Sequence, residues 1–135
     1  MKYKILIVSS NYYTDISNSL LKNARSILQN RAKLKVINVP GVFEIPVVIA
    51  KNVKKFDGFV ALGCVIKGET PHFDLISQAT TNAIMNLSIE NKKPIGNGII
   101  TCLNKKQAKA RSGYSNKANK GLEASKAVIL VLNNI

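Results

Sequence analysis

The residues best suited to chemistry gather in one short stretch, GCVIKGETPHFD, at positions 63–74. This stretch contains the only histidine of the chain, His72, close behind Glu69 and Thr70. A glycine-containing turn that leads into a helix can bind an anion, because the free N–H groups of the first helical turn and the helix dipole both favour negative charge. The stretch therefore predicts a phosphate or another anion held beside an imidazole that can move protons.

The sequence on either side predicts the two elements that would position this turn. Residues 57–62 are apolar and indicate a buried strand, and residues 72–91 indicate a helix. Thr70 is a good helix N-cap and Pro71 suits the first helical position, while Gly68 would let the backbone turn sharply. Such joins occur in α/β proteins of many functions, so the turn alone does not define an activity.

Strand and helix patterns alternate along the whole chain, which predicts a parallel sheet covered by helices. The expected strands are residues 3–9, 33–39, 57–62 and 95–102. The expected helices are residues 16–30, 43–54, 72–91, 107–111 and 121–132. We therefore expect an α/β fold, a flavodoxin-like three-layer αβα sandwich with a four-stranded parallel sheet, formed by residues 1–135 as a single domain.

Unusual residues follow three of the expected strands, at the carboxyl ends where such folds bind ligands. Tyr12 and Tyr13 follow the first strand, residues 40–44 the second, and residues 68–72 the third. Together they would supply an aromatic platform, one carboxylate, an anion site and a base. The sequence contains neither a nucleotide-binding glycine motif nor a cluster of metal ligands, so we expect no dinucleotide, nucleoside triphosphate or metal.

The composition indicates a globular protein with a large excess of positive charge. No apolar run is long enough to span a bilayer, no signal peptide is evident, and Cys64 and Cys102 lack metal-site or redox-motif spacing, so we expect a cytoplasmic protein without a membrane partner. The formal net charge is +13, nearly all of it from lysine. Because asparagine is abundant too, we attribute the charge to a solvated surface rather than to nucleic-acid binding; otherwise residues 105–126 would matter most.

Four segments together resemble the 6,7-dimethyl-8-ribityllumazine synthase family of riboflavin biosynthesis. They are VPGVFEIP at 39–46, GCVIKGETPHFD at 63–74, NKG at 119–121 and NYYTDISNSLL at 11–21. The first two are highly specific, and the resemblance spans essentially the whole chain. It implies a transferase that condenses 5-amino-6-(D-ribitylamino)uracil with L-3,4-dihydroxy-2-butanone 4-phosphate, releases phosphate and water, and uses no cofactor.

The resemblance implies which residues hold the organic part of the substrates. Tyr12 stands where the family places an aromatic ring that stacks on the pyrimidine. Val42, Phe43 and Glu44 match the segment that holds the ribityl chain, whose hydroxyl groups the Glu44 carboxylate can accept. Structural alternatives exist for both: Tyr12 could simply be a rim residue, and Glu44 a favourable charge at a helix N-terminus.

The central stretch would hold the remaining parts of the substrates. By the resemblance, Val65 and Ile66 contact the pyrimidine through backbone groups, and Glu69 and Thr70 bind the phosphate through backbone N–H groups. His72 is the expected catalytic residue, which moves protons during imine formation and phosphate elimination. A lone exposed histidine is also often inert, so this assignment depends on its neighbours.

The resemblance places the active site between the monomers of a pentameric ring, so three more positions concern a neighbouring subunit. Arg111 matches a phosphate-binding arginine and Lys120 a lysine near the substrate. Asn97 stands where many members carry an aromatic residue against the pyrimidine. The segment 111–120 is a residue longer than in members that build large capsids. We therefore expect a homo-oligomer, a pentamer or a decamer, that can associate with riboflavin synthase.

Two other functions fit the sequence less well. A flavodoxin-like binding protein for a phosphorylated ligand would bind without turnover. A basic nucleic-acid-binding protein would show salt-sensitive affinity that depends on lysines rather than on Tyr12 and His72. The sequence shows no RNA-binding motif, and its basic residues are not interleaved with aromatic ones, so the synthase is the preferred interpretation.

Overall fold

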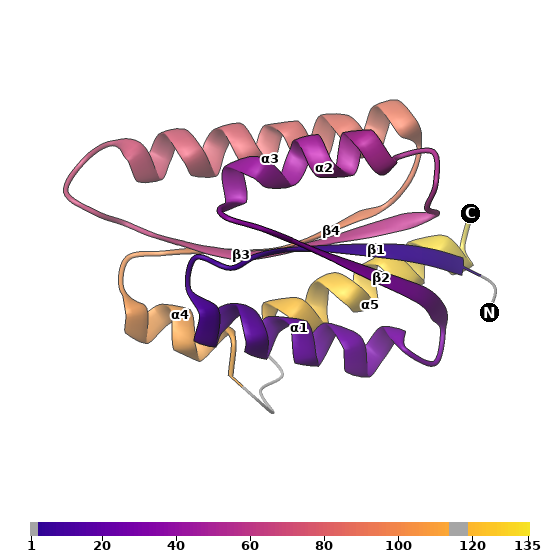
Figure 1. Cartoon of the computed structure of the whole chain (residues 1–135), viewed down its shortest axis with the longest axis horizontal. Coiled ribbons are helices and arrows are strands. Elements are labelled where there is room, and N and C mark those ends of the chain that lie inside the picture. The colour runs from indigo at the N-terminus through magenta and orange to yellow at the C-terminus, as the bar shows by residue number, and fades with distance from the viewer. Residues whose placement is uncertain (1–2, 114–118) are drawn as a thin grey trace.

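A computed structural model describes residues 3–113 and 119–135. Four parallel strands form one sheet in the order β2-β1-β3-β4, and their bounds are β1 (Tyr3–Ser10), β2 (Ala32–Val39), β3 (Gly58–Ile66) and β4 (Ile95–Cys102). Figure 1 shows α2 (Ile45–Asn52) and α3 (His72–Asn91) on one face, and α1 (Thr14–Leu28), α4 (Lys105–Arg111) and α5 (Lys120–Asn133) on the other. The predicted flavodoxin-like αβα sandwich is confirmed.

The central strands are apolar throughout because helices cover both faces of the sheet. Ile5 and Ile7 of β1 belong to the core beneath α1 and α5, whereas Leu6 and Val8 belong to the core beneath α2 and α3. This alternation follows from the pleat, which points successive side chains to opposite faces. Since burying each such side chain contributes roughly 1.5–3 kcal/mol, the two cores hold the sheet as a rigid platform.

Glycines on β4 let α5 lie close against the sheet. A Cβ atom at Gly96 would lie 2.4 Å from the carbonyl oxygen of Ala124 in α5, and one at Gly98 would lie 2.9 Å from the carbonyl oxygen of Ala61 in β3. Neither glycine has a positive φ, so space rather than backbone conformation requires them. The close approach buries Val128 of α5 against the sheet.

The observed elements differ from the predicted ones mainly at their ends. β3 was predicted over residues 57–62 but continues to Ile66, because its last residues pair with β4 as far as Cys102. A 3₁₀ turn, Val42–Glu44, precedes α2, which ends at Asn52. None of the helices in the described ranges is long and apolar enough to cross a membrane.

We predict that Gly96→Ala lowers the free energy of unfolding by about 1–3 kcal/mol, because the added methyl group would overlap the Ala124 carbonyl group and displace α5. Equilibrium urea denaturation measures this loss. Gly68→Ala is the matched control, since nothing lies within 4 Å of a Cβ atom there and its φ is not positive. Equal losses in the two variants would contradict the close packing of α5.

Candidate active site

A cavity of about 490 Å³ opens at the carboxyl edge of the sheet, where β1, β2 and β3 end together. Its walls come from the loops after β1 and β2, the end of β3 and the start of α3. Most of the predicted site residues line it, namely Tyr12, Val42, Phe43, Glu44, Val65, Ile66 and His72. The sheet therefore brings together side chains that are far apart in the sequence, at the edge where parallel α/β folds bind ligands.

The end of β3 offers free backbone groups to this cavity. Pairing between β1 and β3 ends at Ser9 and Leu62, whereas pairing between β3 and β4 continues to Ile66 and Cys102. Beyond Leu62, the edge of β3 that faces β1 therefore has no strand beside it. A ligand in the cavity can hydrogen-bond to this edge much as an added strand would, and Val65 lies at the point of contact.

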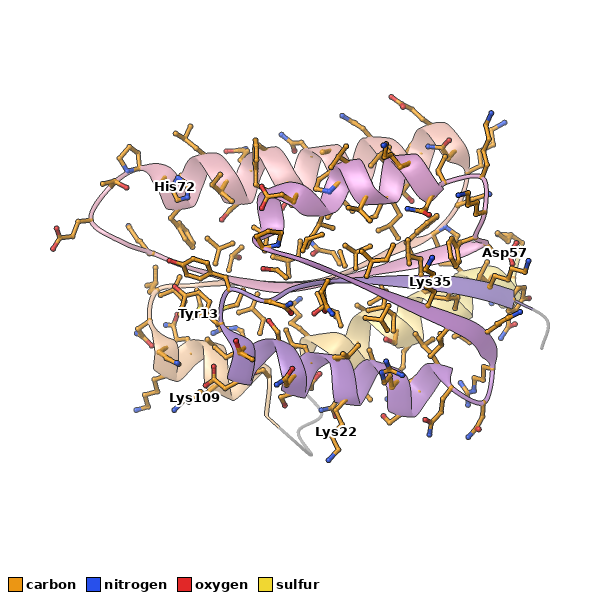
Figure 2. The ribbon with its side chains drawn as sticks, in the orientation of Figure 1. Tyr13, Lys22, Lys35, Asp57, His72 and Lys109 are labelled. Carbon is orange, nitrogen blue, oxygen red and sulfur yellow. The ribbon has the colours of Figure 1, made fainter. Side chains whose placement is uncertain are left out.

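Two tyrosines form the aromatic side of the cavity. The rings of Tyr12 and Tyr13 pack edge to face, with centroids 4.9 Å apart and planes at 77°. Tyr12 is 73% exposed, so its ring is accessible to a flat ligand, whereas Tyr13 is partly buried against the core. Burial and the neighbouring Tyr12 raise the pKa of the Tyr13 phenol, which keeps it a neutral hydroxyl. Figure 2 shows Tyr13 and His72 at the same end of the molecule.

Lys105 links the aromatic side of the cavity to α4. Its Nζ lies 5.9 Å from the centroid of the Tyr13 ring and 3.5 Å from Oδ2 of Asp15 in α1. Burial opposes ionisation of Asp15, but the Ile16 backbone N–H and the Lys105 ammonium group together lower its pKa. Because both charged side chains are exposed, the pair contributes little stability and serves mainly to orient the two helices.

Cys64 contributes a buried thiol to the cavity wall. Burial and the adjacent Cys102 raise the pKa of the Cys64 thiol to about 12, so it stays protonated and is not a nucleophile at neutral pH. Both cysteines are free and buried, which confirms the expectation that they act as small apolar residues. In the described part of the chain, no group of three or more His, Cys, Asp or Glu side chains could hold a metal ion.

The turn between β3 and α3, residues 67–71, is exposed along its length. Thr70 was predicted as the helix N-cap, but α3 begins at His72 and Pro71 occupies the cap position. The physical reason is that the Pro71 carbonyl accepts the Leu75 N–H, at 3.2 Å, and thereby starts the helical hydrogen bonds. The Thr70 hydroxyl still accepts the His72 N–H, at the long distance of 3.4 Å, and so steadies the residue that carries the imidazole.

Access, rather than backbone strain, distinguishes this turn. The prediction that Gly68 allows a sharp turn was wrong, because no glycine in the described ranges has a positive φ. The N–H groups of Glu69 and Thr70 have no hydrogen-bond partner among the described residues, and both side chains are exposed. His72 is exposed and lines the cavity, so free donors and an imidazole lie at the mouth of one space.

Three predicted residues lie away from the cavity of their own chain. Asn97 is exposed on the outer strand β4, where its Oδ1 accepts the Ile99 N–H at 3.1 Å. Arg111 ends α4 and donates to the Gln107 carbonyl at 3.3 Å, while Lys120 begins α5. The insertion predicted within 111–120 falls largely on residues 114–118, which lie outside the described residues.

Sequence reasoning missed four residues of the cavity wall: Pro40, Gly41, Cys64 and Ile76. The first two belong to the VPGVFEIP segment and Cys64 belongs to the central stretch, so motif membership was the available signal. A Cβ atom at Gly41 would lie 3.2 Å from Oε1 of Glu44, so this glycine leaves room for the carboxylate. For Ile76 the signal was its position one helical turn after His72.

Comparison with known proteins agrees with this geometry. The sequence profile of 6,7-dimethyl-8-ribityllumazine synthase matches residues 2–135. Proteins of that name from Bartonella henselae and Agrobacterium fabrum are 44% and 41% identical to the chain over 135 and 138 residues. These matches cover 96% of the chain, and 87% and 93% of the two relatives. The chain belongs to the 6,7-dimethyl-8-ribityllumazine synthase family, transferases of riboflavin biosynthesis.

Proposed function

We propose that the cavity at the carboxyl edge of the sheet, within one domain of residues 1–135, is where 5-amino-6-(D-ribitylamino)uracil condenses with L-3,4-dihydroxy-2-butanone 4-phosphate. The observation that carries this proposal is the convergence of Tyr12, Glu44 and His72, from three separate segments, on one cavity. Its volume of about 490 Å³ lies within the roughly 300–1,000 Å³ of small-molecule sites. A flat ring, a hydroxylated chain and a phosphate require an aromatic face, a carboxylate and N–H donors.

The pyrimidine ring stacks on Tyr12 and hydrogen-bonds to the free edge of β3. The exposure of Tyr12 and the absence of a strand beside Val65 and Ile66 support this orientation. The ribityl chain then extends along the Val42–Glu44 turn, where the Glu44 carboxylate accepts its hydroxyl groups. Because Val42 is buried, it would contribute through its backbone, whereas Phe43, 60% exposed, would cover the chain.

The butanone phosphate binds at the exposed turn. Free N–H groups of Glu69 and Thr70 at the start of α3 would bind its phosphate, and the positive end of the helix dipole favours the charge. The amine attacks the ketone to give an imine, phosphate leaves with the electrons of its C–O bond, and the ribitylamino nitrogen closes the ring with loss of water. His72 transfers protons in these steps, while proximity of the two substrates supplies much of the rate.

A neighbouring subunit would complete the site. Arg111, Lys120 and Asn97 lie outside the cavity of their own chain, which supports their contact with the site of an adjacent copy. Large apolar side chains are exposed on α3, among them Leu75 and Ile89, each 66% exposed, and such surface favours association. The proposed assembly is a homo-oligomer, a pentamer or a decamer. Its cytoplasmic location and its association with riboflavin synthase rest on family membership alone.

We predict that His72→Ala lowers kcat roughly 10²–10⁴-fold with little change in KM, because it removes proton transfer but leaves substrate proximity intact. Lumazine absorbance and phosphate release, followed together with both substrates, measure the rate. Gln78→Ala, an exposed change on the same helix and outside the cavity wall, is the control and should match the wild type. A wild-type rate for His72→Ala, or a larger loss than this range, would refute the assigned role.

We further predict that Arg111→Ala and His72→Ala subunits, each impaired alone, regain activity when unfolded together and reassembled as mixed oligomers. Some interfaces of the mixture would join an intact His72 to an intact Arg111 from the other subunit. Activity that stays at the average of the two parents would place Arg111 in the site of its own chain instead.

Light scattering on the same mixtures supplies the control for assembly. The particles should have the mass of five or ten chains of 14.7 kDa. A megadalton particle would contradict the proposed pentamer or decamer.

A further inference from the structure

A hollow of about 300 Å³ lies at the amino end of the sheet, opposite the active-site cavity. Lysine side chains surround it and an adjoining hollow; together they form the basic hollow, with Lys4, Lys33, Lys35, Lys54, Lys55 and Lys93. Figure 2 shows Lys35 and Asp57 toward the end of the molecule that lies away from His72 and Tyr13. The basic hollow is therefore separate from the site where the substrates react.

The parallel sheet forces these lysines together. Lys4 and Lys33 start β1 and β2 and are paired directly in register, so their side chains leave the same face of the sheet. Lys54 and Lys55 follow α2, and Lys93 precedes β4. Like charges directly opposite each other on adjacent strands destabilise the pairing. The folded chain thus holds several ammonium groups close together against their mutual repulsion.

Little negative charge within the chain offsets these lysines. Asp57 is the carboxylate that lines the hollow, and its Oδ2 already accepts the Lys4 backbone N–H at 2.8 Å. Lys93 donates to the Val53 carbonyl at 2.7 Å, which leaves its charge unneutralised. Across the described ranges, none of the lysines of the basic hollow forms an ion pair with a carboxylate. An anion from outside the chain would therefore meet an uncompensated positive field.

The shape of the basic hollow favours a small anion. Partly buried Phe56 forms its apolar base and packs edge to face on Phe59, with ring centroids 6.1 Å apart. Lysine ammonium groups bind phosphate as point charges, and several of them together suit an anion with several charges. A hollow of about 300 Å³ is at the small end of ligand sites and does not provide the long groove that tracks a nucleic-acid backbone.

We propose that the basic hollow is a binding site for a small multivalent phosphate anion, of the pyrophosphate or triphosphate class. Binding places phosphate oxygens among the ends of Lys4, Lys33 and Lys55 and relieves their repulsion. Because the anion binds the folded chain and not the unfolded one, it also raises thermal stability in proportion to its occupancy. Free polyphosphate and the phosphate groups of a nucleotide share this chemistry, and the experiment separates them.

Isothermal titration of the intact oligomer with pyrophosphate, at constant ionic strength, tests the proposal. The wild type should bind saturably, and the Lys4→Thr/Lys33→Thr double variant about tenfold more weakly, which corresponds to about 1.4 kcal/mol. Lys109→Gln/Lys126→Gln removes the same net charge from exposed positions on α4 and α5 and should bind like the wild type. Equal weakening in both double variants would overturn the proposal, because net charge alone would explain the binding.

Three further titrations close the remaining routes. Arg111→Ala should retain pyrophosphate binding; if it loses binding that the Lys4→Thr/Lys33→Thr variant retains, the anion occupies the reaction site and the proposal fails. Adenosine triphosphate that binds like inorganic triphosphate supports recognition of phosphate alone. A single-stranded oligonucleotide that binds more tightly than triphosphate would overturn the small-anion assignment. Lys55→Gln, on a loop after α2, repeats the test should the strand variant fail to fold.

Discussion

The active site depends on one feature of the sheet: β3 continues to Ile66 although its pairing with β1 ends at Leu62. Pairing with β4 holds this extension straight, so its other edge is both rigid and unoccupied. A ligand can therefore complete the hydrogen bonds of β3 without any movement of the chain. If β1 extended as far, the same backbone groups would be paired inside the sheet and no cavity would lie beside them.

Stability and chemistry reside in different parts of the molecule. The two cores on either side of the sheet are formed by buried strand and helix residues, and they fix where β1, β2 and β3 end. The side chains around the cavity are mostly exposed, from Tyr12 on one side to His72 on the other. Exposed loops on a rigid scaffold suit a reaction that needs two substrates held together more than it needs a strong acid or base.

Alternating apolar patterns sufficed to predict the layers, the parallel sheet and most of the cavity wall, because parallel strands must end at a common edge. The Thr70 cap failed because sequence preference cannot show which carbonyl accepts the first helical hydrogen bond; here Pro71 does. The length of β3 depends on a partner strand far along the chain. The basic hollow escaped notice for the same reason: only the fold brings lysines from Lys4 to Lys93 together.

A crystal structure of the protein with 6,7-dimethyl-8-ribityllumazine and inorganic phosphate tests the central claim most directly. The account predicts the ring between Tyr12 and the free edge of β3, with hydrogen bonds to the backbone of Val65 or Ile66. It predicts the ribityl chain beside Glu44 and the phosphate on the N–H groups of Glu69 and Thr70. A ring bound elsewhere, or a phosphate that leaves this turn untouched, would contradict the account.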